Sequence, residues 1–376
     1  MNRRTDCLLI NCLLAPAGIE HLSPLDWDLL VRQARASNLL AELAVRLGDA
    51  GLLGQVPGAP RKHLDAALQL QKQQESATRW ELQCLLKEMG EQNRPLIVLK
   101  GVAYAARQLP MARGRLFSDV DVLVPRERLD QVESQLMVHG WLHAKTSAYD
   151  QRYYRQWMHE IPPMMHRRRG TNLDLHHAIL PSSARLHVNT QALFDAVVPV
   201  PGLDGVATLC DADMFLHSAT HLFHEGEFGN GLRDLLDLDA LLKHFGKDPA
   251  FWPELLRRAD VLGLQRPLFY ALHFATGLLG TPVPQEVLNQ ARQAAPPRPV
   301  LALMEYCYSR ALQPQHRSCD SASAQLARVL LYLRSHWIRM PLWPLTRHLA
   351  RKTWMRMFET AVQNDDDQIA QKLPAR

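Results

Sequence analysis

Apolar side chains recur every three or four positions over residues 1–90, which is the spacing of helices that bury one face. One such run ends near Gly48, where a glycine is a common helix stop. A long, glutamine-rich helix is predicted from Arg61 to Met89, followed by Gly90. The apolar positions of the first run are Leu29, Leu30, Ala34, Leu39, Leu40, Leu43 and Leu47. The pattern therefore predicts an N-terminal helical region.

The period changes after this region. Leu96–Leu99 is a short apolar run, Val120–Val124 alternates with acidic residues, and Asn172–Leu180 is again extended in character. Helical patterns separate these runs at Val102–Gln108 and Arg126–Val138. Strand, helix, strand, helix and strand in succession predict a small α/β unit of about 110 residues.

The helical period returns at Asp211 and persists to about Leu279. Loops are expected at Ala294–Pro299 and Gln313–Ser323, which are rich in proline or small polar residues. The segment from Ala324 to Phe358 is helical in pattern, basic and tryptophan-bearing. We expect an α+β protein with a small mixed sheet and helical flanks, divided into four regions: 1–90, 91–200, 201–320 and 321–376.

Composition changes this picture little. Forty-three Lys and Arg against 38 Asp and Glu give a net charge of +5 over 376 residues, too mild to indicate nonspecific nucleic-acid binding. Six cysteines without a C-x-x-C pair favour reduced thiols and a cytoplasmic protein. Residues 1–18 resemble a signal peptide, but Asp6 and Asn11 interrupt the apolar stretch, so we expect the first helix of the fold there. The chain lacks the uninterrupted apolar run of about 18 residues that a transmembrane segment needs.

The most informative stretch runs from Leu99 to Val124. If residues 120–124 form a strand, Asp119 and Asp121 share one face while the valines share the other. Two carboxylates on one face repel each other unless a cation lies between them, and Mg²⁺ prefers such hard oxygen ligands. On its own, Asp-x-Asp equally fits an edge strand with solvated aspartates.

The neighbouring residues favour the metal site. Lys100-Gly101 begins a helix, where backbone N–H groups can meet a phosphate. Arg113 and Arg115 come just before the aspartates and could bind a triphosphate bidentately. A further strand carries Asp174 and His176 on one face, so that a third carboxylate could complete a two-metal site for phosphoryl or nucleotidyl transfer.

The order of these motifs resembles the nucleotidyltransferase superfamily with the polymerase-β-type core. The closer resemblance is to a bacterial group of nucleotidyltransferases, NTP-transferase family 5. This resemblance covers about Leu25 to Leu242. The motifs that carry it are, in order, L-K-G, R-x-x-S-D-V-D-V-L-V, a helix ending in H-G-W, L-D-L-H-H, D-M-F-L-H-S-A-T-H and L-R-D-L-L-D-L-D-A-L-L. It implies a nucleotidyltransferase core at 91–200.

The resemblance also implies roles for individual residues. Asp119 and Asp121 would bind catalytic Mg²⁺ (or Mn²⁺), with Asp174 as third carboxylate and acceptor of a proton. Lys100 and Gly101 would replace the superfamily's usual Gly-Ser triphosphate motif, here without a hydroxyl. The remaining residues expected at the nucleotide are Arg115, Ser118 and His176. The partners would be an NTP and an acceptor that the sequence does not identify.

Two alternatives stay open. His217, His221 and His224 lie on one helix face with Asp234 and Asp237 nearby, which fits either packing or the metal site of a phosphohydrolase. The protein could also be catalytically silent, binding a nucleotide while residues 324–358 dock weakly on a membrane surface or a protein. The triple Arg167–Arg169 before Gly170 is most simply an exposed hairpin turn. Signatures of P-loop, Rossmann, serine-hydrolase and zincin chemistry are absent from the sequence.

Overall fold

The computed structural model describes residues 7–143, 154–155 and 157–339. Helices at the two ends of the chain flank a small mixed sheet, so the predicted α+β class is confirmed. The predicted first helix is present: Leu9, Ile10, Cys12 and Leu13 of α1 are buried.

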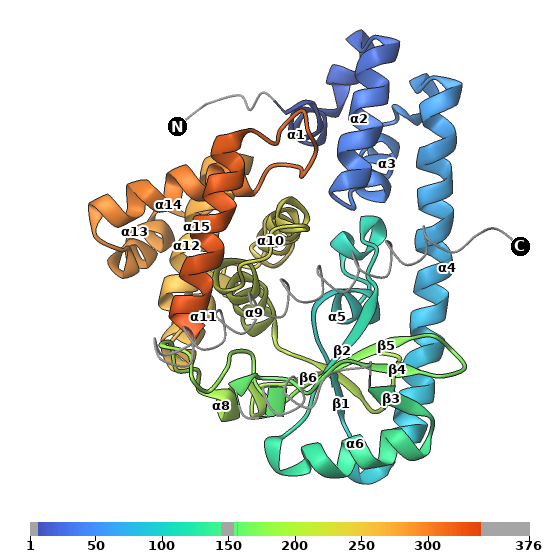
Figure 1. Ribbon diagram of the computed structural model, residues 1–376, viewed down its shortest axis with the longest axis vertical. Helices are drawn as coiled ribbons and strands as arrows, with labels where there is room; N and C mark the ends of the chain where they lie inside the picture. Colours follow the sequence, from blue (N-terminus) through green and yellow to red (C-terminus); the bar gives the residue numbers. More distant parts are fainter. Residues whose placement is uncertain (1–6, 144–153, 156, 340–376) are drawn as a thin grey trace, which may run out of the picture.

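The described part of the N-terminal region, residues 7–90, is mostly helical. Ser23 caps α2 by accepting a hydrogen bond from Asp26 N, while the Asp26 carboxylate accepts one from Ser23 N. The long helix α4 begins three residues before the predicted start and runs beside both the N-terminal helices and the sheet (Figure 1). The helices are α1 (Leu8–Leu14), α2 (Pro24–Ala36), α3 (Leu40–Asp49) and α4 (Gly58–Met89).

The sheet has seven strands in the order β3-β4-β5-β2-β1-β7-β6. Strand β2 pairs parallel with β5 and antiparallel with β1, while β1 pairs parallel with β7. The three predicted strands correspond to β1, β2 and β5, which lie at the centre of the sheet. The four strands that the pattern missed are only two or three residues long, too short to show a period. The strands are β1 (Leu96–Val98), β2 (Asp119–Leu123), β3 (Trp141–His143), β4 (Met164–His166), β5 (Asn172–His176), β6 (Val198–Pro199) and β7 (Val206–Thr208).

The described part of the sheet region also contains the helices α5 (Lys100–Ala106), α6 (Leu129–Val138) and α8 (Thr190–Phe194). The arginine triple does form the turn between β4 and β5, as predicted. It is not wholly exposed, however, because the Arg169 guanidinium donates hydrogen bonds to Glu81 and Glu88 of α4. These carboxylates draw the third arginine inward and attach the hairpin to the long helix.

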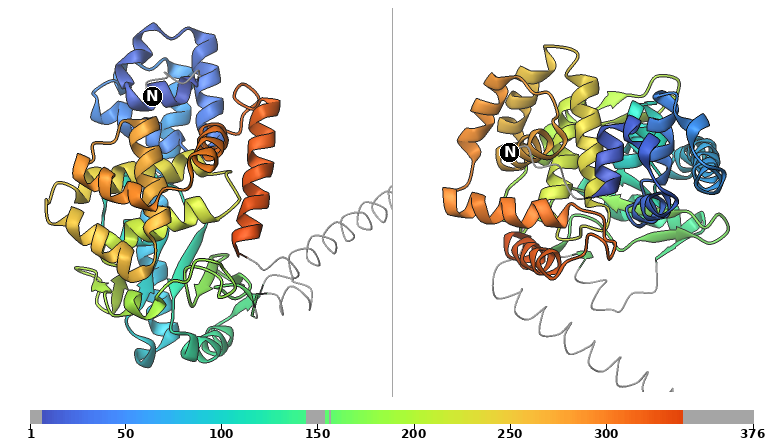
Figure 2. Two further views of the ribbon diagram at one scale, coloured as in Figure 1. Left: turned by 90° about the vertical axis from the view of Figure 1, so that its left-hand side faces the viewer. Right: turned by 90° about the horizontal axis from the view of Figure 1, so that it is seen from above.

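The C-terminal region is helical as predicted. Helix α9 packs against α10, α11 and α12, and α14 packs against α15 at the outer side of the bundle (Figure 2). Both predicted loops are present but shorter, since α14 starts at Arg298 and α15 at Ala322. The helices are α9 (Asp211–His224), α10 (Gly231–Phe245), α11 (Phe251–Leu262), α12 (Gln265–Leu279), α13 (Gln285–Ala291), α14 (Arg298–Ala311) and α15 (Ala322–Arg339).

The predicted basic helix from 324 to 358 is seen as far as Arg339, and residues 340–358 lie outside the described part of the chain. Docking through this segment stays a prediction. No helix among the described residues is long and apolar enough to cross a membrane.

One contiguous cluster of buried apolar side chains extends from Cys7 to Leu331. Its largest fully buried members include Tyr104 of α5, Trp141 of β3 and Phe223 of α9. Burial of this kind is worth about 1.5–3 kcal/mol for each large side chain. The shared core holds the sheet firmly between the two sets of helices, while the four-region division stays a prediction.

Candidate active site

Strands β2 and β5 bring the three predicted carboxylates together. Val120 and Val122 anchor one face of β2 in the core, so Asp119 and Asp121 share the other face. In the parallel register, Asp121 lies directly beside Asp174 of β5. Each of the three aspartates offers a carboxylate oxygen, and these oxygens lie within 4.8 Å of one another.

Asp121 is buried, and its carboxylate contacts two side chains, the Lys100 ammonium and the His176 ring. Its Oδ1 atom lies 2.8 Å from Lys100 Nζ and accepts a hydrogen bond from His176 Nε2 at 3.0 Å. Burial by itself would raise the pKa of the Asp121 carboxyl. The Lys100 ammonium and the His176 hydrogen bond outweigh that effect and hold the pKa well below its usual range. Asp121 is therefore ionised, as a metal ligand must be.

Asp174 has the opposite electrostatic environment. Burial, followed by repulsion from Asp121 and Glu160, raises the pKa of Asp174 to about 7. A cation between these carboxylates would relieve the repulsion. The hard oxygen donors of the trio fit Mg²⁺ or Mn²⁺ rather than a softer metal.

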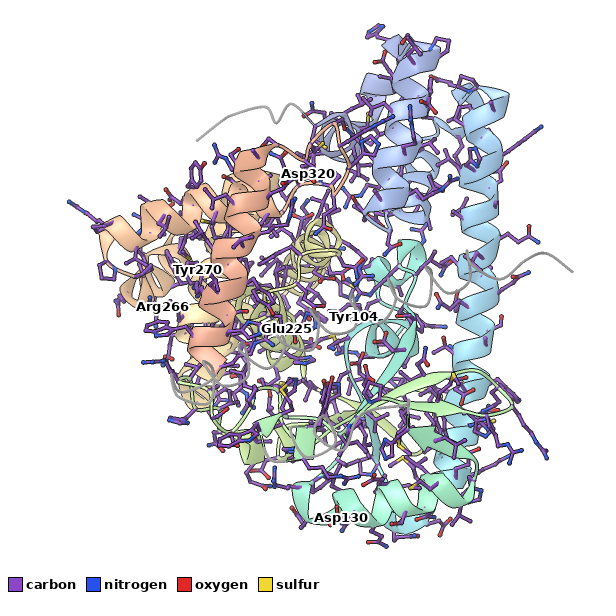
Figure 3. All side chains as sticks on the ribbon, viewed as in Figure 1. Tyr104, Asp130, Glu225, Arg266, Tyr270 and Asp320 are labelled. Atoms are coloured by element: carbon purple, nitrogen blue, oxygen red, sulfur yellow. The ribbon has the colours of Figure 1, made fainter. Side chains whose placement is uncertain are left out.

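A cavity of about 310 Å³ opens beside Asp119 and Asp121. One wall of the cavity is formed by α5, by the segment that leads into β2 and by β2 itself. The other wall is formed by the end of α9, the loop that follows it and the start of α10. Figure 3 shows Tyr104 of α5 and Glu225, which follows α9, near the centre of the molecule. Four predicted nucleotide-binding residues, Lys100, Gly101, Arg115 and Ser118, line this cavity.

Gly101 is required by a close approach of side chains. A Cβ atom at this position would lie 2.9 Å from Arg115 Nε and 3.2 Å from Phe117 Cβ, closer than van der Waals contact allows. Both neighbours also line the cavity. The glycine thus lets the start of α5 approach the segment that leads into β2.

Arg115 and Ser118 contact carboxylates within the chain. The buried Arg115 guanidinium forms an ion pair with Asp237 and lies 3.7 Å from Asp234. From the sequence alone, these two aspartates are expected near the histidines of α9. Ser118 is exposed, and its Oγ donates a hydrogen bond to Asp119 Oδ1 at 3.2 Å. Arg115 is therefore a tethered cation at the cavity wall.

His176 is almost fully buried between two carboxylates. Its Nε2 atom faces Asp121, and its Nδ1 atom lies 3.3 Å from Glu160 Oε2. His176 is not among the residues that line the cavity. The structure thus places it behind Asp121, where it orients that carboxylate.

The three histidines of α9 lie in different surroundings. His217 and His224 are buried, and burial lowers the pKa of both rings. His221 lines the cavity, with its Nε2 atom 3.0 Å from Glu225. Within the described residues these histidines form no group of three metal-ligating side chains. This favours packing over the phosphohydrolase metal site.

Several cavity residues were not predicted from the sequence. Tyr104 and Ser218 share a hydrogen bond of 2.6 Å across the α5–α9 contact, and Arg233 pairs with Asp234. Glu225 carries a pKa below its usual range because His221 and Lys100 outweigh its burial. Ser218, Glu225 and Arg233 lie far from β2 in the sequence, so no local pattern marks them. Tyr104 lies close to β2 in the sequence, but its place in an apolar helix gives no sign of a cavity contact.

Comparison with known families shows the family of the chain. The family model described as an uncharacterised nucleotidyltransferase matches residues 23–280, more than half of the chain. Neither the curated proteins nor the solved structures contain a match. The matched stretch includes α5, β2, β5, α9 and α10, which carry the carboxylates and most of the residues that line the cavity. The chain belongs to this nucleotidyltransferase family.

Proposed function

We propose that the protein transfers an NMP group from an NTP to a hydroxyl or phosphate acceptor and releases pyrophosphate. The observation that carries the proposal is the convergence of Asp119, Asp121 and Asp174 on two parallel strands, with Asp119 and Asp121 lining a cavity. Three hard oxygen donors at one point suit divalent cations that bridge protein and phosphate.

The trio would hold Mg²⁺ or Mn²⁺. When bound, the cation would neutralise charge on the reacting phosphate. Asp121 is prepared for this role because Lys100 and His176 fix its Oδ1 atom and keep it ionised. Ser118 similarly restrains Asp119 through its hydroxyl.

The chain also supplies groups for the triphosphate and the acceptor. Lys100, Arg115 and Arg233 line the cavity and provide positive charge for phosphate oxygens. The acceptor oxygen would attack the α-phosphorus as the bond to the bridging oxygen of pyrophosphate breaks. Asp174, once ionised, would take the proton of an acceptor hydroxyl.

Nucleotide binding tests the proposal without requiring the acceptor. Calorimetric titration of each NTP in Mg²⁺ should show binding to the wild type and at least about tenfold weaker binding to Asp119→Asn and Asp121→Asn. Asp130→Asn is the matched control, because Asp130 is exposed on α6 and far from Glu225 (Figure 3). Equal NTP affinity in both site variants and the wild type would overturn the site assignment.

A further inference from the structure

A second group of metal-ligating side chains lies behind the aspartate trio. It consists of His159, Glu160 and His176, each of which offers a ligand atom within 4.8 Å of the others. Glu160 forms an isolated antiparallel bridge with His176. The flanking backbone is also fixed, because Ile161 N donates to Leu175 O and His177 N donates to His159 O. The three side chains are therefore held together by the end of β5.

Both ring nitrogens of His176 face carboxylates. Nε2 is 3.0 Å from Asp121 Oδ1, and Nδ1 is 3.3 Å from Glu160 Oε2. A neutral imidazole that donates its Nε2–H to Asp121 has a lone pair on Nδ1. That lone pair would face a carboxylate oxygen unless a cation or a proton lies between them.

His159 supplies a second, independent observation. The residue is only 7% exposed, its ring stacks on that of His176 with centroids 5.5 Å apart, and among the described residues its Nδ1 atom has no hydrogen-bond partner. A buried polar atom without a partner destabilises the folded protein, and a cation bound to it would remove that cost.

We propose that His159, Glu160 and His176 bind a transition-metal cation of the Zn²⁺ class, separate from the Mg²⁺ site of the trio. Two imidazoles and one carboxylate are a donor set typical of zinc with one open position. The 3.3 Å between His176 Nδ1 and Glu160 Oε2 equals the spacing of about 3.3 Å expected for two ligands of a tetrahedral zinc ion.

Asp121 links this site to the trio. A metal-ligating histidine usually donates its other ring N–H to a carboxylate, which fixes the tautomer and the ring orientation. Asp121 accepts that hydrogen bond here. The same aspartate would thus ligate Mg²⁺ on one side and orient a zinc ligand on the other.

Metal content of the full chain tests the proposal. The protein would be stripped with EDTA, dialysed into excess Mg²⁺ to occupy the trio, given one equivalent of Zn²⁺ and freed of unbound metal by gel filtration. The wild type should retain close to one Zn²⁺ per chain. His159→Gln and Glu160→Gln should each bind Zn²⁺ at least about tenfold more weakly. Glu160 is partly exposed, so its variant should fold even if loss of the buried imidazole perturbs the other.

Two controls give the result its meaning. His224→Gln removes another buried histidine with an unpartnered Nδ1 and should leave Zn²⁺ binding unchanged. Asp119→Asn should keep Zn²⁺ while losing Mg²⁺-dependent NTP binding, which separates this proposal from the proposed function. Co²⁺ in place of Zn²⁺ should give the visible bands of a four-coordinate ion without thiolate charge transfer.

The opposing account places a proton on His176 between its two carboxylates, with no metal. It predicts a wild type that retains no Zn²⁺ after gel filtration. That result would overturn the proposal, as would Zn²⁺ binding that persists in both His159→Gln and Glu160→Gln or disappears in His224→Gln.

Discussion

Lys100 Nζ lies 2.8 Å from Asp121 Oδ1, so the residue expected to hold the triphosphate neutralises a proposed metal ligand. Lys100 also has a left-handed backbone, with φ at +48°, which non-glycine residues seldom adopt. The ion pair suits a lysine that neutralises Asp121 in the metal-free protein and could contact phosphate once Mg²⁺ is bound.

Replacement of Lys100 should separate its contribution to the stability of the fold from its contribution to NTP binding. Lys100→Met leaves the buried Asp121 with only His176 as partner, and we expect a loss of about 2–3 kcal/mol in the free energy of unfolding. Saturating Mg²⁺ should recover part of that loss, and NTP affinity should fall at least about tenfold. Urea denaturation with and without Mg²⁺ measures the first effect and calorimetry the second. A variant with unchanged stability in metal-free buffer would contradict the ion pair.

Gly101 offers a test of the cavity wall. In Gly101→Ala the new methyl group would press on Arg115 and Phe117, which should cost about 1–3 kcal/mol and weaken NTP binding. Gly277→Ala is the control, since Gly277 lies in α12 with nothing within 4 Å of an added Cβ and should be neutral or slightly stabilising. Thermal melts of the two variants compare them directly. Equal melting temperatures would show that the wall has room that the structure does not indicate.

The arginine triple provides a matched pair. Arg169→Leu would leave Glu81 and Glu88 without their guanidinium, with an expected loss of about 2–3 kcal/mol. Arg168→Leu, one residue away on the exposed turn, should change the stability by less than about 0.5 kcal/mol. Similar denaturation midpoints for both variants would argue against the anchoring of the hairpin to α4.

Acid should destabilise the protein through its buried histidines. Burial, followed by Arg334 and Arg339, lowers the pKa of His224 to about 3. Because the unfolded chain takes up that proton near pH 6.5, stability is full above this pH and falls as the pH drops toward 3. His224→Gln should remove about 2 kcal/mol of the decline between about pH 6.5 and pH 5. Urea midpoints across this range measure it, and identical pH profiles would show that His224 titrates normally.

The predictable part of the fold consists of segments long enough to show their own period. The helix from Arg61 to Met89 was predicted nearly to its limits, and the alternation of Val120 and Val122 with aspartates indicated which face of β2 carries the carboxylates. Asp174 was predicted to join them as the third carboxylate of a two-metal site on a further strand, as the family resemblance also implies. The register of β2 and β5 places it there.

The rest depends on contacts between distant segments. Glu160 reaches His176 through a single bridge in a stretch without period, and Asp237 meets Arg115 because α10 packs near the turn that precedes β2. No pattern in the neighbouring sequence predicts either contact. The pairing of Lys100 with Asp121 was also missed, because its sequence position suggests phosphate as readily as carboxylate.

Pyrophosphate release tests the central claim most directly. Purified protein would be mixed with each NTP, Mg²⁺ or Mn²⁺ and a cell extract as the source of acceptor, beside an Asp119→Asn/Asp121→Asn double variant and the Asp130→Asn control. The proposed function predicts pyrophosphate from the wild type and the control alone, together with a labelled product that identifies the acceptor. Release that is equal in the double variant would contradict the assignment of these aspartates. A wild type that binds NTP but releases no pyrophosphate would contradict nucleotidyl transfer and indicate a nucleotide-binding protein.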